Sequence, residues 1–356
     1  MSTFEEYIRQ GEPVRSAKAA AWQAAIGLQD VDGLKPSEYL VETAKRHIEG
    51  DVTIQEVKGL IDTYYQSRAG RLSIEEERTE EADKVSARIT EILQEETFSF
   101  TPAELQRIHR RLFEGIFQFA GKFRDYNISK AEWVLNGASV LYNPYENLKE
   151  TLDYDFAEEK KVDYSSATSD EAIKHIGSFI SGIWQIHPFG EGNTRTTAVF
   201  LIQYLRSFGY TVSNELFASH SWYFRNALVR ANYFNREKGL VPTGKYLEAF
   251  LRNLILGEHN ELRNRYLHVD YPAQSDTDEI SKGQIGTLNV TLEELAVLKL
   301  LQKNPKMRQT EVAAKIGKSD RTVKRITDSL KEKEVLARRG GKRDGWWEVL
   351  TINNLV

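Results

Sequence analysis

Two runs of apolar residues with helical spacing flank one polar segment of the chain, residues 186–197. The run before the segment has Phe179, Ile180, Ile183 and Trp184, and the run after it covers residues 198–202. This spacing predicts two helices joined by a polar turn. Residues 128–142 instead suggest two short strands around Asn136-Gly137, a dipeptide typical of hairpin turns.

The C-terminal part of the chain predicts three short helices followed by a hairpin. Residues 291–302 begin with a threonine and a glutamate three positions later, which is a helix start signal. Residues 310–316 and 319–335 follow as the second and third helices, and residues 338–349 read as strand, turn and strand. This order of elements resembles a winged helix.

The polar segment puts a base, a carboxylate, two glycines, an amide and an arginine into residues 187–195. Pro188 forces His187 out of the helix, and Gly190 and Gly192 allow backbone angles that other residues resist. Free amides at the start of the second helix, with a nearby arginine, favour phosphate binding. A structural turn is the alternative. His187 and Glu191 have the spacing of metal ligands on a helix, but the proline and glycines make a regular helix here unfavourable.

The sequence of residues 187–195, HPFGEGNTR, resembles the signature of the Fic (Fido) family, His-x-Phe-x-Asp/Glu-Gly-Asn-Gly-Arg-x-x-Arg. Residues 105–124 resemble the family's opening helix and Ala-Gly-x-x-Arg turn, and residues 127–142 its hairpin flap. The resemblance covers residues 101–257. It implies an all-helical core with a β-hairpin flap and an enzyme that transfers AMP from ATP to a Ser, Thr or Tyr hydroxyl of a protein.

The resemblance also implies a role for each residue of the signature. His187 would take the proton from the target hydroxyl, for which a group titrating near neutrality is suited. Glu191 would hold Mg²⁺ between two phosphates of ATP. Arg195 would neutralise the leaving pyrophosphate. The residues expected to bind nucleotide phosphates are Gly190, Gly192, Asn193, Thr194 and Arg195.

Two positions depart from the signature. Thr194 stands where the second glycine is expected, and Ala198 where the last arginine is expected. In the family, the last arginine of the signature binds the nucleotide phosphates and pairs with an inhibitory glutamate. Its absence leaves open whether AMP or a related phosphate-containing group is transferred.

The resemblance places two further surfaces near this turn. The flap would align the target protein through Val134, Leu135, Asn136 and Gly137, by strand addition, although its apolar side chains could equally serve packing. The helix within residues 221–233 would bring Tyr223 and Asn226 to the adenine side.

Residues 24–61 resemble in layout the small antitoxin-like module that many Fic proteins carry. At the inhibitory position we read Ala25-x-x-x-Gln29-Asp30, with glutamine in place of glutamate. On this alignment the inhibitory acid and its arginine are both absent, so ordinary auto-inhibition is not expected. A helical support region is the alternative interpretation. The acidic run at residues 74–83 is expected to be a solvated helix face.

Composition indicates a cytoplasmic protein without disulfides. The 356 residues include no cysteine, the N-terminus is polar, and no stretch approaches the roughly 20 apolar residues of a membrane helix. The net charge is −4, but residues 286–356 hold 15 Lys/Arg against 9 Asp/Glu, which leaves −10 for the rest. A basic segment on an acidic body suggests a separate task for that segment.

Double-stranded DNA is the expected partner of this basic segment, with protein contacts as the alternative. Arg321, Lys324 and Arg325 would lie on the third helix, placed for the major groove. Lys342 and Arg343 would tip the wing and contact phosphate.

The sequence thus predicts a mainly α protein with an N-terminal helical, degenerate antitoxin-like region (1–95), a Fic domain (101–257) and a winged-helix domain (286–356). Two functions compete. The first is a Fic-type nucleotidyltransferase that uses ATP and Mg²⁺ on a protein substrate. The second is a DNA-binding regulator whose Fic core binds a nucleotide without turnover. Retention of both His187 and Glu191 favours the enzyme, and a homodimer is left open.

Overall fold

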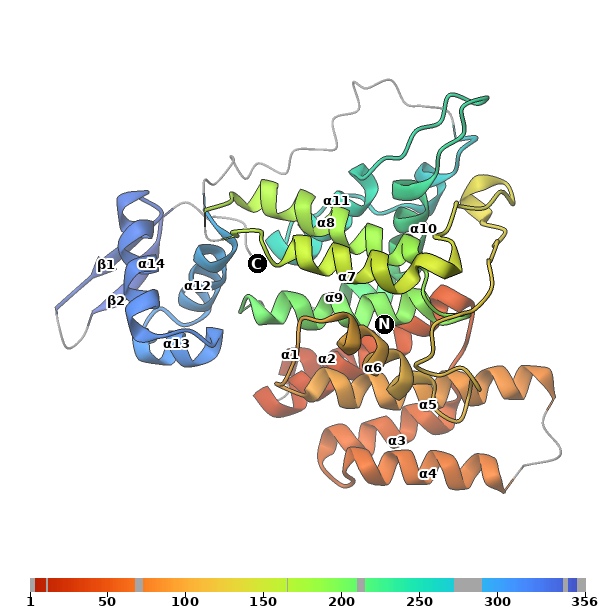
Figure 1. Cartoon of the computed structure of the whole chain (residues 1–356). Helices are drawn as coiled ribbons and strands as arrows, with labels where there is room; N and C mark the ends of the chain where they lie inside the picture. The colour runs from red at the N-terminus through yellow and green to blue at the C-terminus, as the bar shows by residue number, and fades with distance from the viewer. Residues whose placement is uncertain are drawn as a thin grey trace.

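The computed structural model describes residues 4–10, 12–67, 73–164, 166–209, 215–271, 290–341 and 345–350. Within them the chain is mainly helical, and the only strands form one two-stranded sheet near the C-terminus. Figure 1 shows a central group of helices, with the N-terminal helices on one side and the small C-terminal module at the left end. The expected mainly α fold is therefore confirmed.

The N-terminal region folds around its own small apolar core. Its helices are α1 (Glu5–Gln10), α2 (Pro13–Gly27), the 3-10 helix η1 (Leu28–Asp32), α3 (Glu38–Glu49), α4 (Ile54–Gln66) and α5 (Ile74–Gln94). Capping boxes begin α4 and α5, because Thr53 and Ser73 bond the backbone of a glutamate three residues on. Buried Trp22 donates its indole N–H to Nδ1 of His47 (3.0 Å) in this core.

The central region packs helices from well-separated parts of the chain into one apolar core. These helices are α6 (Pro102–Phe113), η3 (Tyr145–Asn147), α7 (Leu148–Glu159), α8 (Ser169–Ile186), α9 (Asn193–Ser207), α10 (Glu215–Asn232), α11 (Lys245–Leu256) and η4 (Asn264–Leu267). Every residue from 193 to 205 is buried, which makes α9 the central helix. On the other side of the core, α2 packs against both α5 and α10, so the N-terminal region is held next to the polar turn.

The flap keeps the expected turn but not the expected strands. Asn136 and Gly137 have positive φ (56° and 81°), and Glu132 N–H donates to the Ala138 carbonyl (3.0 Å). Trp133–Leu135 form the 3-10 helix η2 instead of a strand. The prediction of a β-hairpin at this place is therefore wrong in detail, because Val134 and Leu135 are both drawn into the core, whereas alternating strand residues point to opposite faces.

The C-terminal module has the predicted order of elements: α12 (Leu292–Lys303), α13 (Gln309–Ile316), α14 (Asp320–Glu332), β1 (Leu336–Arg339) and β2 (Trp346–Val349). The strands are antiparallel, with Leu336 opposite Val349. Thr291 caps α12 through the capping box expected from the sequence. The module touches the central region at the start of α8, where Ser169 N–H and hydroxyl both bond the Val290 carbonyl (3.0 and 2.7 Å).

None of the helices in the described ranges is long and apolar enough to cross a membrane.

Candidate active site

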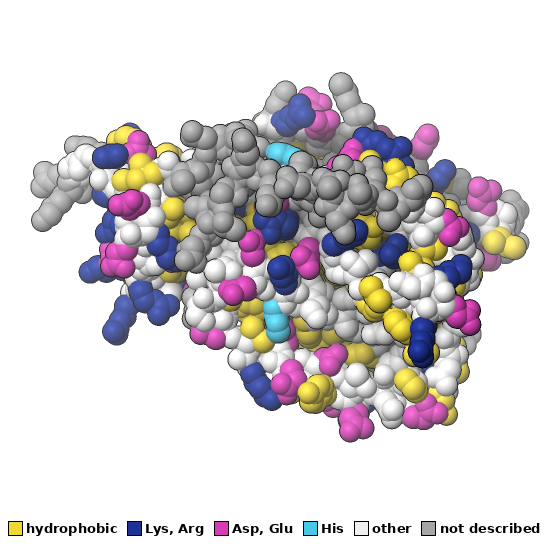
Figure 2. All heavy atoms as spheres, turned by 90° about the horizontal axis from the view of Figure 1, so that it is seen from above, with side chains coloured by type: hydrophobic (Ala, Val, Ile, Leu, Met, Phe, Trp, Pro, Cys, Tyr) yellow, Lys and Arg dark blue, Asp and Glu magenta, His cyan; other side chains and the backbone are white. Residues whose placement is uncertain are grey.

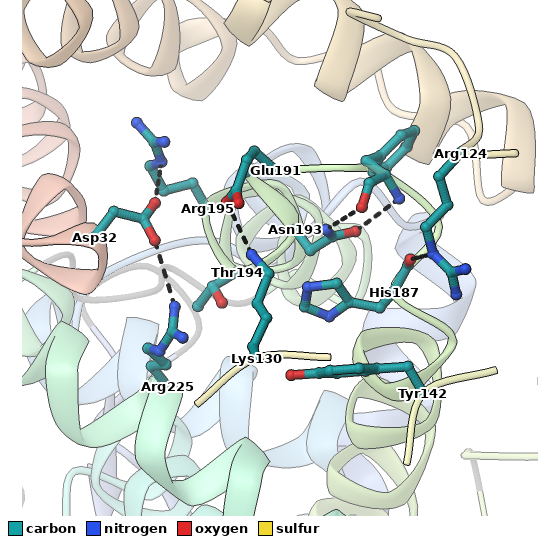
Figure 3. A network of polar contacts seen from close by, with 12 residues as sticks. Asp32, Arg124, Lys130, Tyr142, His187, Glu191, Asn193, Thr194, Arg195 and Arg225 are labelled. Carbon is teal, nitrogen blue, oxygen red and sulfur yellow. Dashed lines mark hydrogen bonds and ion pairs between the residues drawn. The ribbon is translucent and has the colours of Figure 1, made fainter. Parts of the chain in front are cut away.

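The turn between α8 and α9 is held in a conformation that a histidine rarely adopts. His187 ends α8 with φ 51° and ψ 59°, in the left-handed region. Arg124 stabilises this backbone, because its Nε donates to the His187 carbonyl (2.8 Å) and its Nη2 to the Ile186 and Asn143 carbonyls (3.3 and 2.5 Å). Figure 3 shows the Arg124 contact. The arginine of the Ala-Gly-x-x-Arg turn is therefore a support for the histidine backbone.

The His187 imidazole has one nitrogen bonded and one nitrogen free. Nδ1 lies 3.1 Å from the Trp184 carbonyl, which can only accept, so Nδ1 carries the proton. Nε2 is buried, bears a lone pair and has no hydrogen-bond partner. Desolvation lowers the pKa of His187 well below its usual value, and the positive charge of Lys130 lowers it further. The free nitrogen is thus unprotonated at neutral pH.

A flap tyrosine covers this histidine. The rings of Tyr142 and His187 have centroids 4.3 Å apart, and His187 is only 3% exposed. Tyr142 therefore packs against the imidazole and contributes to its burial.

Two glycines let the turn pass close to other groups. A Cβ on Gly192, where φ is 76°, would lie 2.4 Å from the Phe113 ring, and a Cβ on Gly190 would lie 2.7 Å from the Tyr126 hydroxyl oxygen. Gly192 is also the N-cap of α9 and offers no side-chain cap. The first amides of α9 are consequently available to an anion.

Asn193 and His109 brace the turn from inside. Both ends of the Asn193 amide bond the backbone of Phe189 (3.0 and 2.7 Å), so this side chain shapes the loop. Gly121 N–H donates to Nδ1 of His109, and Nε2 of His109 then donates to the Glu191 carbonyl (2.9 and 3.0 Å). The His109 ring stacks on Phe189 with centroids 3.7 Å apart.

Thr194 faces into the protein. Its hydroxyl accepts the Trp184 indole N–H (3.0 Å), and the residue is 3% exposed. The extra side chain at this signature position therefore ties α9 to α8, away from the open part of the site.

Glu191 is the exposed carboxylate of the turn and pairs with the flap. Its side chain is 53% exposed and lies 2.8 Å from Nζ of Lys130. No cluster of three metal-ligating side chains occurs among the described residues. One carboxylate facing an open pocket does fit Mg²⁺, because this ion takes few protein ligands when substrate phosphates supply the others.

Arg195 is almost fully buried and is held by the N-terminal region. Its Nε lies 2.8 Å from Asp32, its Nη2 2.6 Å from Glu81, and its Nη1 donates to the Gln29 side chain (3.1 Å). The alignment expected no acid of this region to reach an arginine of the signature, and the structure differs at this point. Asp32, three residues after the Gln29 position that we aligned with the inhibitory glutamate, meets an arginine of the signature.

The acidic run at residues 74–83 is likewise not a purely solvated face. Glu81 on α5 reaches Arg195, as described above. Asp83 is buried and accepts hydrogen bonds from Ser37 and Tyr65. The helix turns two of its carboxylates inward because polar partners on other helices compensate for their burial.

A pocket of about 730 Å³ opens beside these groups. Its lining includes Asp32, Glu81, Phe117, Lys130, Glu191, Arg195, Trp222 and Arg225. Trp222 and Arg225 come from α10. Their helix neighbours Tyr223 and Asn226, expected on the adenine side, are buried and do not line the pocket; Asn226 donates to the Asn264 side chain (2.7 Å).

The flap residues expected to bind the target divide into two kinds. Val134 and Leu135 are buried in the core, whereas Asn136 is exposed and bonds Asp270. Trp133, which is 49% exposed, and Leu141, at 85%, present the flap's apolar surface to solvent. The flap therefore serves both packing and presentation of apolar groups.

The basic residues of the C-terminal module lie where a nucleic acid could reach them. Arg321, Lys324 and Arg325 are exposed on α14, while Val323 and Ile326 on the opposite side are buried. Figure 2 shows Lys and Arg side chains gathered at the left end of the molecule, over this module. Lys342 and Arg343 lie outside the described residues.

Several residues of the site gave no signal in the sequence. His109, Lys130 and Arg225 lie in segments that the resemblance covers, but no pattern singled out these residues, and only their tertiary contacts bring them to the turn. Asp32 had a weak signal, since the Asp32-Gly33 turn ends η1 with Gly33 in the left-handed conformation.

Comparisons with known proteins place the turn within a matched domain. Residues 99–205 match the Fic/DOC family, and residues 294–336 match a winged helix-turn-helix DNA-binding family. The protein adenylyltransferase VbhT of Bartonella schoenbuchensis is 28% identical over 108 residues, which are 30% of this chain and 21% of that protein. The probable protein adenylyltransferase y4lH of Sinorhizobium fredii is 33% identical over 116 residues, 32% of this chain and 56% of that protein.

Among solved structures, a Fic family protein from Desulfovibrio desulfuricans matches with a TM-score of 0.42 and 12% identity, covering 99% of this chain and 94% of that one. The chain matches about a fifth of the length of the first relative and just over half of the second. The protein contains a Fic/DOC domain over residues 99–205, followed by a winged helix-turn-helix over residues 294–336.

Proposed function

We propose that this protein transfers AMP from ATP to a Ser, Thr or Tyr hydroxyl of a protein, with His187 as the base. The observation that carries the proposal is the buried, unpartnered Nε2 of His187, on the same turn as Glu191, which lines a pocket together with Arg195. The two relatives named adenylyltransferases support the same reaction.

In this reaction the target hydroxyl oxygen attacks the α-phosphorus and its proton goes to Nε2 of His187. The bond between the α-phosphorus and the oxygen that joins it to the β-phosphate breaks, and pyrophosphate leaves with that oxygen. Arg195 and the free amides at the start of α9 stabilise the charge on the phosphates. Mg²⁺ would be held by Glu191 and the ATP phosphates, and would supply further charge neutralisation there.

The charges around His187 suit this role once a nucleotide is present. Burial lowers the pKa of His187 most, and Lys130, Arg225 and Arg124 lower it further because they repel a proton on the ring. Phosphate groups next to Lys130 and Arg225 would offset this repulsion, so the pKa of the base would rise toward the range that favours proton transfer.

The N-terminal region would oppose this reaction. Asp32, Glu81 and Gln29 occupy the guanidinium of Arg195, so a phosphate must compete with them for the same donors. We therefore propose a restrained enzyme, in which ATP binds poorly until Asp32 withdraws.

The test is transfer from ATP labelled on the α-phosphate to proteins of a cell lysate, with Mg²⁺. We expect labelled protein bands with Asp32→Ala, stronger than with the unchanged chain. Adding His187→Ala to Asp32→Ala should remove the bands, because loss of a general base typically costs about 10² to 10⁴ in rate. Transfer that survives in the double variant would refute the role of His187, and labelling from the γ-phosphate alone would refute AMP transfer.

A second candidate function is regulation through DNA, favoured by the exposed arginines and lysine of α14. Fluorescence anisotropy of the full chain with random duplex DNA at two salt concentrations tests it. Binding should weaken with salt by a log–log slope of about −0.9 per phosphate contact. Arg321→Ala with Arg325→Ala should weaken it, whereas Lys45→Ala, at a half-exposed lysine of the N-terminal region, should not. Absence of binding at low salt would leave a protein-contact module.

A further inference from the structure

One carboxylate in the pocket lies between two arginines from different helices. Asp32 Oδ2 is 2.8 Å from Nε of Arg195 on α9, and its Oδ1 is 3.4 Å from Nη1 of Arg225 on α10. Figure 3 shows the carboxylate placed between the two guanidinium groups. Asp32 thus marks a position where one anionic group contacts both arginines.

Arg195 is buried, Arg225 is largely buried, and each keeps a second acid. The side chains of Arg195 and Arg225 are 2% and 14% exposed. Arg195 also pairs with Glu81, and Arg225 binds both carboxylate oxygens of Glu132 (3.0 and 3.1 Å). If Asp32 withdrew, Glu81 and Glu132 would still pair with the two arginines. Both guanidinium groups would then stay in the pocket without becoming unpaired buried charges.

The α9 helix itself offers only one such arginine. Three positions after Arg195 the chain has Ala198, which is fully buried. Arg225 brings the second guanidinium to the pocket from α10, one helical turn beyond Trp222, with its carbon Cζ 5.8 Å from that indole ring. A planar guanidinium binds phosphate oxygens through paired N–H donors, which an ammonium group cannot do in the same way.

We propose that Arg225 is a phosphate-binding residue of this site and acts with Arg195 on the polyphosphate of a nucleoside triphosphate. Asp32 is the internal anion that occupies the two arginines in its absence. The identity of the ligand rests on the proposed function, whereas the anion site rests on the two ion pairs of Asp32.

A purely structural role for Arg225 makes a different prediction. In that case the arginine only anchors the flap through Glu132, and loss of either partner would have the same effect. As a phosphate-binding residue, Arg225 is needed for anions, while Glu132 is not.

The experiment measures binding of ATP, adenosine and inorganic tripolyphosphate by calorimetry to the full chain carrying Asp32→Ala. In this background we expect Arg225→Gln to weaken ATP and tripolyphosphate at least about tenfold, as for loss of one charged contact, and to leave adenosine unchanged. Glu132→Gln should retain ATP affinity, because its amide oxygen still accepts from Arg225. Arg236→Gln, an exposed arginine beyond the end of α10, controls for loss of a positive charge.

Arg225→Lys serves if Arg225→Gln fails to fold, and should also weaken tripolyphosphate because the paired donors are lost. Equal affinity of Arg225→Gln or Arg225→Lys and the Asp32→Ala parent would overturn the proposal. So would an equal loss in Glu132→Gln, or no binding of ATP and tripolyphosphate by the parent. A chain that binds ATP through Arg225 but transfers no AMP would refute the proposed function alone.

Discussion

His109 should make the stability of this protein depend on pH between about 6.5 and 4. Burial lowers the pKa of His109 to about 4, from an ordinary value of 6.5. The neutral ring accepts Gly121 N–H at Nδ1 and donates to the Glu191 carbonyl from Nε2. A second ring proton, on Nδ1, would face the Gly121 N–H.

The direction of this pH dependence follows from which state of the chain, folded or unfolded, binds more protons. The unfolded chain protonates His109 near pH 6.5 and the folded chain only near pH 4, so the unfolded state binds more protons in this window. The free energy of unfolding therefore falls as pH drops through it. The full loss is roughly 3 kcal/mol, of which roughly 2 kcal/mol is gone by pH 5.

Urea unfolding followed by circular dichroism at pH 7 and pH 5 measures this loss. His109→Phe keeps an aromatic ring against Phe189 but removes the titration, so its unfolding free energy should fall by roughly 2 kcal/mol less than that of the unchanged chain. His259→Gln, at an exposed histidine, should behave as the unchanged chain. Buried His47, whose pKa burial also lowers to about 4, contributes equally in all three. Identical losses in the unchanged chain and His109→Phe would refute the reasoning.

Three other substitutions test how the turn is held. Gly192→Ala should cost roughly 3 kcal/mol in thermal unfolding, since it combines a left-handed φ with a contact to Phe113; an unchanged Tm would contradict this. Arg124→Met should lower the Tm and abolish AMP transfer even where the chain still folds, as the His187 backbone loses its donor, and full activity would argue against the support role. Thr194→Gly restores the signature residue but should destabilise the fold by about 2 kcal/mol in urea, because the Trp184 indole loses its acceptor and glycine disfavours helix; a neutral effect would contradict this.

The alignment of the N-terminal region shows where sequence reasoning failed. The position that we aligned with the inhibitory glutamate holds Gln29, which does reach Arg195, but the carboxylate comes from Asp32. Leu28–Asp32 form a 3-10 helix, which has three residues per turn, so Gln29 and Asp32 lie on the same side. The alignment considered only the position of Gln29, and the acid three residues later was missed.

The prediction of strands in the flap failed for a different reason. Asn136-Gly137 correctly marked the turn, because its backbone angles follow from residue type. Strand pairing depends instead on which side chains the core accepts, and burial of both Val134 and Leu135 favoured a 3-10 turn.

By itself, the sequence determined local features of this protein: the helices around the polar turn, the capping box at Thr291, the break at His187-Pro188 and the positions of the glycines. Each of these local features depends on residues only a few positions apart, so a short segment of sequence is enough to predict it. Only the tertiary structure decided which charges meet Arg195, because Gln29 and Glu81 lie 166 and 114 residues away along the chain. Ion pairs over such separations form only where packed helices bring the groups together, and there a carboxylate and a phosphate can compete for the same arginine.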